Sequence, residues 1–292
     1  TTKSVAAFLT KSQCWRISTG EIPQNVGAMK NLDYLWISGH RGLVGTLPPS
    51  LFELINLEFL YVNGNSLIGS VSENIGQLTK LMDFRINDNS FNGTIPDAIK
   101  LCQELEILDF SHNDLSGTLP SGLFELSTLQ YFYMRANSLT GSISEDIGQL
   151  TKLNHLWVDE NKFNGTIPNS IGLCQDLEKL HLQESGLHGT LPDGLYDLMN
   201  LQDLYLDRND FSGTISERIG DMTGLLDLRL YENRFSGALP STPGFCEDLE
   251  ILLIENTNIT GTLPQEVCAL TAKNLFSIEY AALRADCYSG DV

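Results

Sequence analysis

Short apolar stretches alternate with polar turns along this chain, in a pattern that returns every 24 residues. Each period reads L-x-x-L-x-L, then an asparagine, a further leucine or phenylalanine, and a glycine. The alternation of apolar and polar residues in L-x-L predicts a short strand whose leucines point into a core. The glycine recurs without a gap at Gly45, Gly69, Gly93, Gly117, Gly141, Gly165, Gly189, Gly213, Gly237 and Gly261. This fixed period predicts a stack of similar units in place of one globular core.

The polar positions of the period predict how the chain turns after each strand. An asparagine follows the strand at Asn65, Asn89, Asn113, Asn137, Asn161, Asn209 and Asn233. Because an amide donates and accepts hydrogen bonds at once, stacked asparagines can satisfy the turn backbone between units. Ser185 and Thr257 interrupt this series. The glycine allows a tight bend, and the proline that usually follows it predicts the start of a helix-like segment.

A longer period, three units in length, lies above the first. The segment G-S-V-S-E-N-I-G-Q-L-T-K-L at Gly69 returns almost unchanged at Gly141 and in altered form at Gly213. Every third unit replaces the proline by serine, at Ser72, Ser144 and Ser216. We interpret this super-repeat as duplication of blocks of three units, without a functional meaning of its own.

Leucines at this spacing are typical of a leucine-rich-repeat solenoid. We therefore expect an α/β solenoid: a right-handed superhelix with a parallel β-sheet on its concave side and 3-10 or short helical segments on its convex side. Such a core grows in one dimension, so 292 residues do not exceed its size limit. We divide the chain into an irregular N-terminal cap or entry segment at 1–19, repeats of 24 residues at 20–270, and a C-terminal cap at 271–292.

The element G-(T/S)-(I/L)-P resembles the plant-specific class of leucine-rich repeats over roughly residues 20–280. That class includes the ectodomains of plant receptor kinases and the secreted polygalacturonase-inhibiting proteins. The sequence L-R-A-D-C at Leu283–Cys287 is similar to the C-terminal cap of repeat proteins from diatoms and related algae. The resemblance implies a secreted or cell-surface, receptor-like binding protein.

The six cysteines fall into two groups. Three of them occur at intervals of three units: Cys102, Cys174 and Cys246. At about 4.8 Å per strand, neighbours in this group would lie ~14 Å apart, beyond the ~7 Å limit between the Cα atoms of a disulfide. We expect these three to be buried thiols. Cys268 and Cys287 could close a loop at the C-terminal end as a disulfide, which fits an oxidising compartment, and Cys14 is left over.

Charge and missing motifs exclude several functions. The formal charge is −19, which disfavours nucleic acid and anionic lipid and favours cationic or neutral partners. No apolar run reaches the ~18 residues of a membrane span, so we expect no direct membrane insertion. No zinc, phosphate-loop or Ser/His/Asp spacing occurs, so we predict no metal, no cofactor and no catalytic residue. Asp203 and Asp227 lie one strand apart, but an open sheet offers no dry pocket for glycosidase chemistry.

The residues that flank the inward leucines of each strand should point out from the concave face. Six aromatic or imidazole rings then fall on adjacent strands: Tyr131, Tyr133, His155, Trp157, His181 and Tyr205. Exposed rings in one patch are typical of binding surfaces, whereas cross-strand packing is the structural alternative. We add Asp159, Asp207 and Arg229, which share this face, and predict a ligand-binding site.

Three N-x-T sequences, at Asn92, Asn164 and Asn258, are predicted glycosylation sites of a glycoprotein on the secretory route. The function that we predict is an extracellular, non-enzymatic module that binds a protein, peptide or polysaccharide on its concave face. The first alternative is an inhibitor of a secreted glycan-degrading enzyme. The second is a structural or adhesive component of an extracellular matrix or surface assembly.

Overall fold

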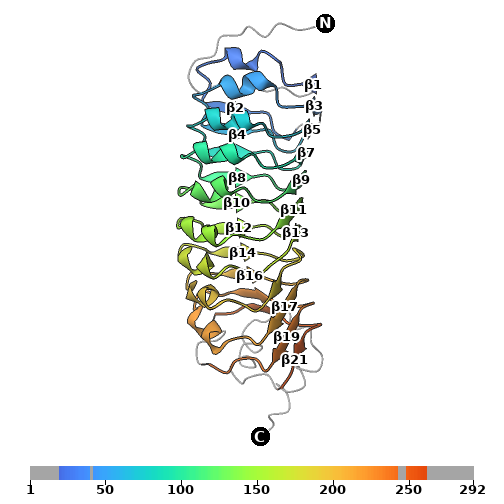
Figure 1. Cartoon of the computed structure of the whole chain (residues 1–292), viewed down its shortest axis with the longest axis vertical. Helices are drawn as coiled ribbons and strands as arrows, with labels where there is room; N and C mark the ends of the chain where they lie inside the picture. The colour runs from blue at the N-terminus through green and yellow to red at the C-terminus, as the bar shows by residue number, and fades with distance from the viewer. Residues whose placement is uncertain (1–19, 40–41, 243–247, 262–292) are drawn as a thin grey trace.

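The computed structural model describes residues 20–39, 42–242 and 248–261. These residues form a leucine-rich-repeat solenoid, as the sequence period predicts: successive coils stack into a column, each with a strand, a turn and a short 3-10 segment (Figure 1). In Figure 1 the 3-10 segments lie along one side of the column and a second set of strands lies along the other. The predicted fold class is therefore confirmed, while the cap and repeat boundaries remain predictions.

The main sheet has ten strands in sequence order, all parallel. They are β2 (Tyr34–Trp36), β4 (Phe59–Tyr61), β6 (Asp83–Arg85), β8 (Ile107–Asp109), β10 (Tyr131–Tyr133), β12 (His155–Trp157), β14 (Lys179–His181), β16 (Asp203–Tyr205), β18 (Asp227–Arg229) and β20 (Ile251–Leu253). The middle residue of each strand, such as Leu156, is buried in the core. The two residues beside it point to the other face of the sheet. We call this the open face; it is the face predicted to be concave.

A second parallel ribbon, which the sequence analysis did not predict, runs through the periodic glycines. It contains a seven-stranded sheet and a four-stranded sheet. The seven strands are β1 (Gly20–Glu21), β3 (Leu43–Gly45), β5 (Ser66–Gly69), β7 (Ser90–Gly93), β9 (Asp114–Gly117), β11 (Ser138–Gly141) and β13 (Lys162–Phe163). The four are β15 (His188–Gly189), β17 (Asp210–Gly213), β19 (Arg234–Gly237) and β21 (Asn258–Ile259). We call the two together the second sheet.

The helix-like segments are 3-10 helices, as expected. Their bounds in the described residues are η1 (Val26–Ala28), η2 (Pro49–Glu53), η3 (Glu73–Gln77), η4 (Asp97–Leu101), η5 (Ser121–Glu125), η6 (Glu145–Gln149), η7 (Asn169–Leu173), η8 (Asp193–Asp197) and η9 (Glu217–Asp221). Pro120 precedes η5 with φ −69°, the value that its ring imposes. Ser144, which replaces proline before η6, has φ −70° and accepts a hydrogen bond from Asp146 N. Serine thus begins the segment through a side-chain cap where proline does so through its ring.

Stacked leucine and phenylalanine side chains fill the space between the sheets and the 3-10 helices. Cys102 and Cys174 lie in this core as free thiols, which confirms the prediction for these two. Burial raises the pKa of each thiol to about 12. Cys246, the predicted Cys268–Cys287 disulfide, Cys14 and the L-R-A-D-C cap lie outside the described residues.

The predicted asparagine ladder is present. Asn113 donates from Nδ2 to the carbonyls of Ile86 and Phe110, at 3.1 Å each, and its Oδ1 accepts from Phe91 N at 2.9 Å. This joins consecutive coils through one side chain. At the interruption, the Ser185 hydroxyl still donates to Val158 O at 3.2 Å. Ser185 accepts no bond from Phe163 N, and the second sheet is split at this point, between β13 and β15.

Candidate functional site

Four rings on consecutive strands of the open face form one stack. Trp157 and His181 are parallel within 1°, with their centroids 4.9 Å apart. His181 and Tyr205 follow at 4.1 Å and 13°, and Tyr133 packs on the other side of Trp157 at 4.5 Å and 45°. We call Tyr133, Trp157, His181 and Tyr205 the aromatic stack. The parallel register places one ring over the next because Tyr133 pairs with Trp157, and Trp157 with His181.

Polar groups fix the C-terminal end of the aromatic stack. The guanidinium of Arg229 lies 4.0 Å from the centroid of the Tyr205 ring. The Tyr205 hydroxyl donates to Asp227 Oδ2 at 2.8 Å, and Arg229 Nη2 donates to the same oxygen at 2.8 Å. Cation–π contact and the shared carboxylate hold both side chains in one orientation.

Tyr131 and His155 extend the cluster toward the start of the strands. Their rings meet edge-on, with centroids 5.0 Å apart. The Tyr133 hydroxyl lies 2.7 Å from His155 Nδ1, a hydrogen-bond distance. Burial is the main cause that lowers the pKa of His155. All six rings predicted to form one patch therefore lie together on β10, β12, β14 and β16.

The exposure of the predicted site differs from the expectation. The rings are half-buried by one another, and His181 is only 9% exposed. Asp159 and Asp207, expected on the surface, are 0% and 3% exposed. The physical reason is that side chains one strand spacing apart cover each other's faces, as the cross-strand packing alternative predicts.

Two adjacent coils of this site, in β12, β14 and the turns that follow them, contain buried polar atoms without a hydrogen-bond partner. Seven such side-chain atoms occur among the described residues, and four belong here: Trp157 Nε1, Asp159 Oδ1, His181 Nε2 and Gln183 Oε1. Burial is the main cause that lowers the pKa of His181 to about 3, so its ring is neutral at physiological pH. Buried polar groups in folded proteins are nearly always paired. The concentration of exceptions in one patch marks it as a candidate ligand site.

Asp159 is the electrostatic centre of this patch. Its Oδ2 accepts from Gln183 Nε2 at 2.9 Å and pairs with Arg135 Nε at 3.1 Å. Burial raises the pKa of Asp159 to about 7, against the opposing effect of Arg135. The predicted site did not include Arg135 and Gln183, although both occupy the column of Asp159, one unit before it and one unit after it. Their spacing of 24 residues from Asp159 could have identified them from the sequence.

A second aromatic patch lies on the same face near the other end, outside the predicted site. The rings of Tyr34 and Phe59 are 5.3 Å apart, and Trp36, which is 44% exposed, packs edge-on against Tyr61. The Tyr61 hydroxyl donates to Asp83 Oδ2 at 2.6 Å. Among the described residues, this patch has no buried side-chain nitrogen or oxygen without a partner on its four rings. The buried polar atoms of these rings therefore lack no hydrogen-bond partner, in contrast to those of the aromatic stack.

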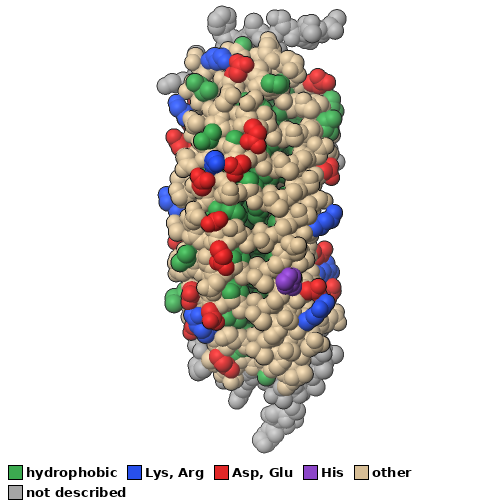
Figure 2. Space-filling view, viewed as in Figure 1, with side chains coloured by type: hydrophobic (Ala, Val, Ile, Leu, Met, Phe, Trp, Pro, Cys, Tyr) green, Lys and Arg blue, Asp and Glu red, His purple; other side chains and the backbone are tan. Residues whose placement is uncertain are grey.

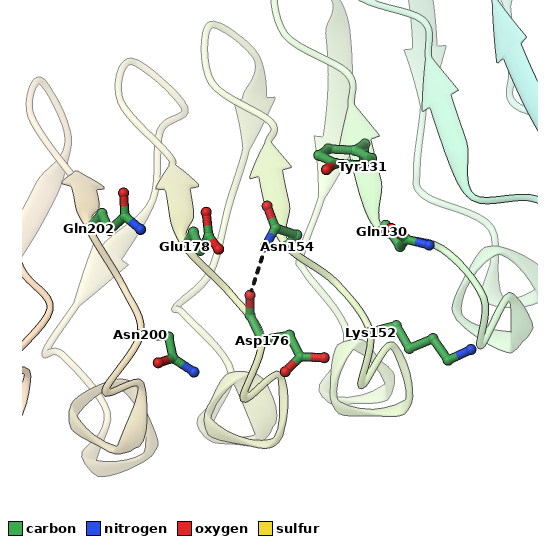
Figure 3. A pocket seen from close by; sticks show the side chains of 8 residues that line it. All are labelled: Gln130, Tyr131, Lys152, Asn154, Asp176, Glu178, Asn200 and Gln202. Carbon is green, nitrogen blue, oxygen red and sulfur yellow. Dashed lines mark hydrogen bonds between the residues drawn. The ribbon is translucent and has the colours of Figure 1, made fainter.

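A polar groove borders the aromatic site where the 3-10 segments lead into the strands (Figure 3). It has a volume of about 560 Å³ and is lined by Gln130, Tyr131, Lys152, Asn154, Asp176, Glu178, Asn200 and Gln202. Asn154 Nδ2 donates to Asp176 O at 3.2 Å, which ties two coils together. Tyr131 belongs to both the groove and the ring cluster, so a ligand on the open face could extend into the groove.

The remaining predictions concern glycosylation, metal binding and membrane insertion. Asn92, Asn164 and Asn258 are exposed, and glycosylation of them stays a prediction. Across the part of the chain that the structure describes, no cluster of three or more His, Cys, Asp or Glu side chains is arranged to hold a metal ion. No helix in residues 20–39, 42–242 or 248–261 is long and apolar enough to cross a bilayer.

Comparison with known proteins supports the repeat assignment. The family model described as Leucine Rich Repeat matches residues 56–78, 104–126, 152–174 and 200–222. No curated protein sequence matches the chain. Among solved structures, a TDR receptor is 31% identical with a TM-score of 0.83, over 86% of this chain and 44% of the receptor. The Arabidopsis receptor kinase HAESA, in complex with the peptide hormone IDA and the co-receptor SERK1, is 30% identical with a TM-score of 0.81.

The chain spans less than half of both receptors: the HAESA match covers 86% of this chain and 42% of that one. A plant ice-binding protein is also similar, at 26% identity and a TM-score of 0.70. This match covers 79% of the chain and 74% of the ice-binding protein. The similar structures thus include a plant receptor kinase in complex with a peptide hormone, and a plant ice-binding protein of which the match covers a larger share.

Proposed function

We propose that this chain is an extracellular, non-enzymatic module that binds a peptide or a segment of a protein across the aromatic stack on its open face. The observation that carries the proposal is the pairing of aromatic surface with unpartnered polar atoms at Trp157, Asp159, His181 and Gln183. Rings supply contact area at low entropy cost, and the free donors and acceptors supply directional bonds. An extended peptide offers both N–H and C=O groups to such a surface.

The similar structures favour a peptide over a polysaccharide as the ligand. HAESA is described in complex with a peptide hormone and a co-receptor, and it has the same repeat fold. The polysaccharide alternative rests on the aromatic rings and the polar groove alone. The same proposal includes membership of the plant-specific repeat class, an algal type of C-terminal cap and secretion. It also includes glycosylation at Asn92, Asn164 and Asn258.

The proposal is tested by affinity capture from the native extracellular fraction followed by mass spectrometry. Wild type should capture a peptide or protein, and Trp157→Ala or Tyr205→Ala should lose it, since truncation of a central aromatic residue at an interface costs about 2 kcal/mol or more. Leu173→Ala is the matched control, because this exposed leucine lies on η7, away from the open face. Equal capture by all four proteins would overturn the proposal. A secreted glycan-degrading enzyme as the captured partner would establish the inhibitor alternative, and self-association independent of Trp157 would establish the matrix alternative.

A specific row of hydroxyl groups favours ice as a second candidate ligand. The residue after each glycine of the second sheet is exposed and is threonine or serine in eight successive coils: Thr46, Ser70, Thr94, Thr118, Ser142, Thr166, Thr190 and Thr214. Successive members lie about one strand spacing, ~4.8 Å, apart. In Figure 2 much of the surface beside the second sheet has the colour shared by the backbone and by side chains that are neither apolar nor charged. We call these eight residues the hydroxyl row.

The glycines hold the hydroxyl row in place. A Cβ atom added at Gly141 would lie 2.8 Å from Thr118 Cγ2, and one at Gly117 would lie 2.8 Å from Thr94 Cγ2. Each threonine methyl therefore occupies the space that the next glycine leaves open. We infer that this contact holds the six threonines of the row in one rotamer, with their hydroxyl groups at regular spacing. Regular, rigid hydroxyl groups can order bridging water, and the match to the similar plant ice-binding protein covers most of this chain.

The ice candidate is tested by thermal hysteresis and by partition of fluorescently labelled protein into a growing ice crystal. Wild type should partition into ice, and Thr118→Tyr should reduce this several-fold because a bulky ring breaks the plane of the row. Trp157→Ala, on the open face, should leave partition unchanged. Exclusion of the wild type from ice, or equal partition of Thr118→Tyr, would reject this candidate.

A further inference from the structure

The Asp159–Gln183 pair combines an acidic environment with two acceptor oxygens that have no partner. Asp159 Oδ1 and Gln183 Oε1 are both buried and both unpartnered. They come from adjacent coils and are held together by the bond from Gln183 Nε2 to Asp159 Oδ2. A buried acceptor without a donor costs about 1–3 kcal/mol. A group that carries several N–H donors would satisfy both acceptors.

The charges around the pair select the sign of that group. Asp159 faces Arg135 on the preceding coil, Glu160 on its own coil and Asp207, two coils further along the column. Asp207 is buried as well, and burial raises its pKa. Asp207 also faces Arg208 and Arg229, but Arg208 pairs with Glu184 and Glu232, and Arg229 pairs with Asp227. With these groups included, six carboxylates face three guanidiniums, so the local balance is negative. The chain as a whole carries −19, which also draws cations toward the surface.

We propose that the Asp159–Gln183 pair is the subsite for one basic group of the ligand, a guanidinium or alkylammonium of a peptide. This inference rests on the proposed peptide-binding function and names the chemistry of its central contact. The basic group would donate to Asp159 Oδ1 and Gln183 Oε1, while the neighbouring Trp157 and His181 rings pack against its aliphatic stem.

A ligand cation would reach the subsite by taking the place of Arg135 in its ion pair with Asp159. The Asp159 carboxylate is buried, and the Arg135 side chain that pairs with it is 39% exposed. Arg135 reaches Asp159 Oδ2 through Nε at 3.1 Å, and it holds Glu160 Oε1 through both Nε and Nη2. It can therefore turn away from Asp159 and keep its second carboxylate. A ligand cation then replaces one charge-assisted bond and satisfies two additional acceptors.

The probe for the test is N-acetyl-arginine amide, with N-acetyl-citrulline amide as its neutral counterpart of the same shape. Binding is followed by NMR at the Trp157 indole N–H and the Gln183 side-chain amide. At pH 8 the arginine probe should shift both signals saturably, whereas citrulline should not. At pH 5.5 the arginine affinity should fall, because the pKa of Asp159 is raised to about 7 and its carboxyl is then protonated.

Asp159→Asn should weaken arginine binding about tenfold or more at pH 8 and remove the pH dependence. Asp210→Asn is the matched control, since it removes the same charge from an exposed carboxylate that pairs with Arg234 on the second sheet. Gln183→Leu provides a second variant that keeps the charge and removes one acceptor; several-fold weaker binding is expected. Equal responses to arginine and citrulline, or wild-type affinity in both variants, would overturn the subsite.

The two proposals fail in different ways. If Trp157→Ala abolishes partner capture but arginine does not bind in an Asp159-dependent manner, the subsite is wrong and the peptide-binding function stands. If arginine binds through Asp159 but no partner depends on Trp157, the proposed function is wrong and the cation subsite stands.

Discussion

The interruption of the asparagine ladder at Ser185 allows a prediction of increased stability. Asn161, one rung earlier, donates to Met134 O and Val158 O at 3.0 Å each and accepts from Leu139 N at 3.0 Å. The Ser185 hydroxyl lies 3.2 Å from both Val158 O and Gln183 O, but it has no bond to Leu182 O and accepts none from Phe163 N. We expect Ser185→Asn to add one donated and one accepted bond. We also expect it to draw the backbone at Gly186, which has a φ of +76° where the preceding units have a strand residue, toward the geometry of those units.

The magnitude follows from these two bonds. Each contributes about 0.5–1.5 kcal/mol net, and ordering of the longer side chain costs about 0.5–1 kcal/mol. The net gain is therefore about 1 kcal/mol, the centre of a range of about 0–2.5 kcal/mol. It should be local, because each repeat of a solenoid contacts only its neighbours. The second sheet should also become continuous between β13 and β15.

The assay is amide hydrogen exchange at Phe163, supported by chemical denaturation. A gain of about 1 kcal/mol slows exchange at this amide by a factor of about 5. Asn161→Ser is the mirror control and should accelerate exchange at Leu139 by a similar factor. Unchanged protection of Phe163 in Ser185→Asn, with a normal response in the control, would refute the reasoning that the missing acceptor splits the sheet.

Three further outcomes are expected. The pKa of Asp159 is about 7 in the folded state, above its unfolded value, so the folded state binds more protons and the free energy of unfolding should fall as pH rises from about 4 through 7. Urea denaturation of Asp159→Asn at several pH values should lack this fall. A pH profile identical to that of the wild type would contradict the raised pKa of Asp159. His181, with a pKa of about 3, should stay neutral by ¹⁵N NMR from pH 8 down to about 5, and titration near pH 6.5 would argue against its burial in the stack. Gly141→Ala should cost about 1 kcal/mol or more in denaturation because φ is +81° and the added Cβ meets Thr118 Cγ2; Thr118→Ser should recover part of this cost in a double-mutant cycle, and strict additivity would exclude the contact.

Much of the fold could be predicted because the period is a local property of the sequence. Leucines at fixed intervals can bury only one face of each coil, which determines the strand, the turn and the register of the ten-stranded sheet. The same register located the rings of the aromatic stack and the buried thiols Cys102 and Cys174. The second sheet was missed because its strands read only as a leucine and a glycine between polar residues. Their pairing depends on neighbouring coils that approach closely at glycine.

The sequence alone determined the scaffold and the columns of its open face, since both follow from the fixed length of the repeat. Tertiary structure decided which members of those columns are buried and which of their atoms have partners. Asn87 and Glu255 of the same column also have a buried oxygen without a partner, but Asp159 and Gln183 lie on adjacent coils and are joined by a hydrogen bond. That depends on rotamers and on distances of about 3 Å between neighbouring coils, and no spacing along the chain specifies them.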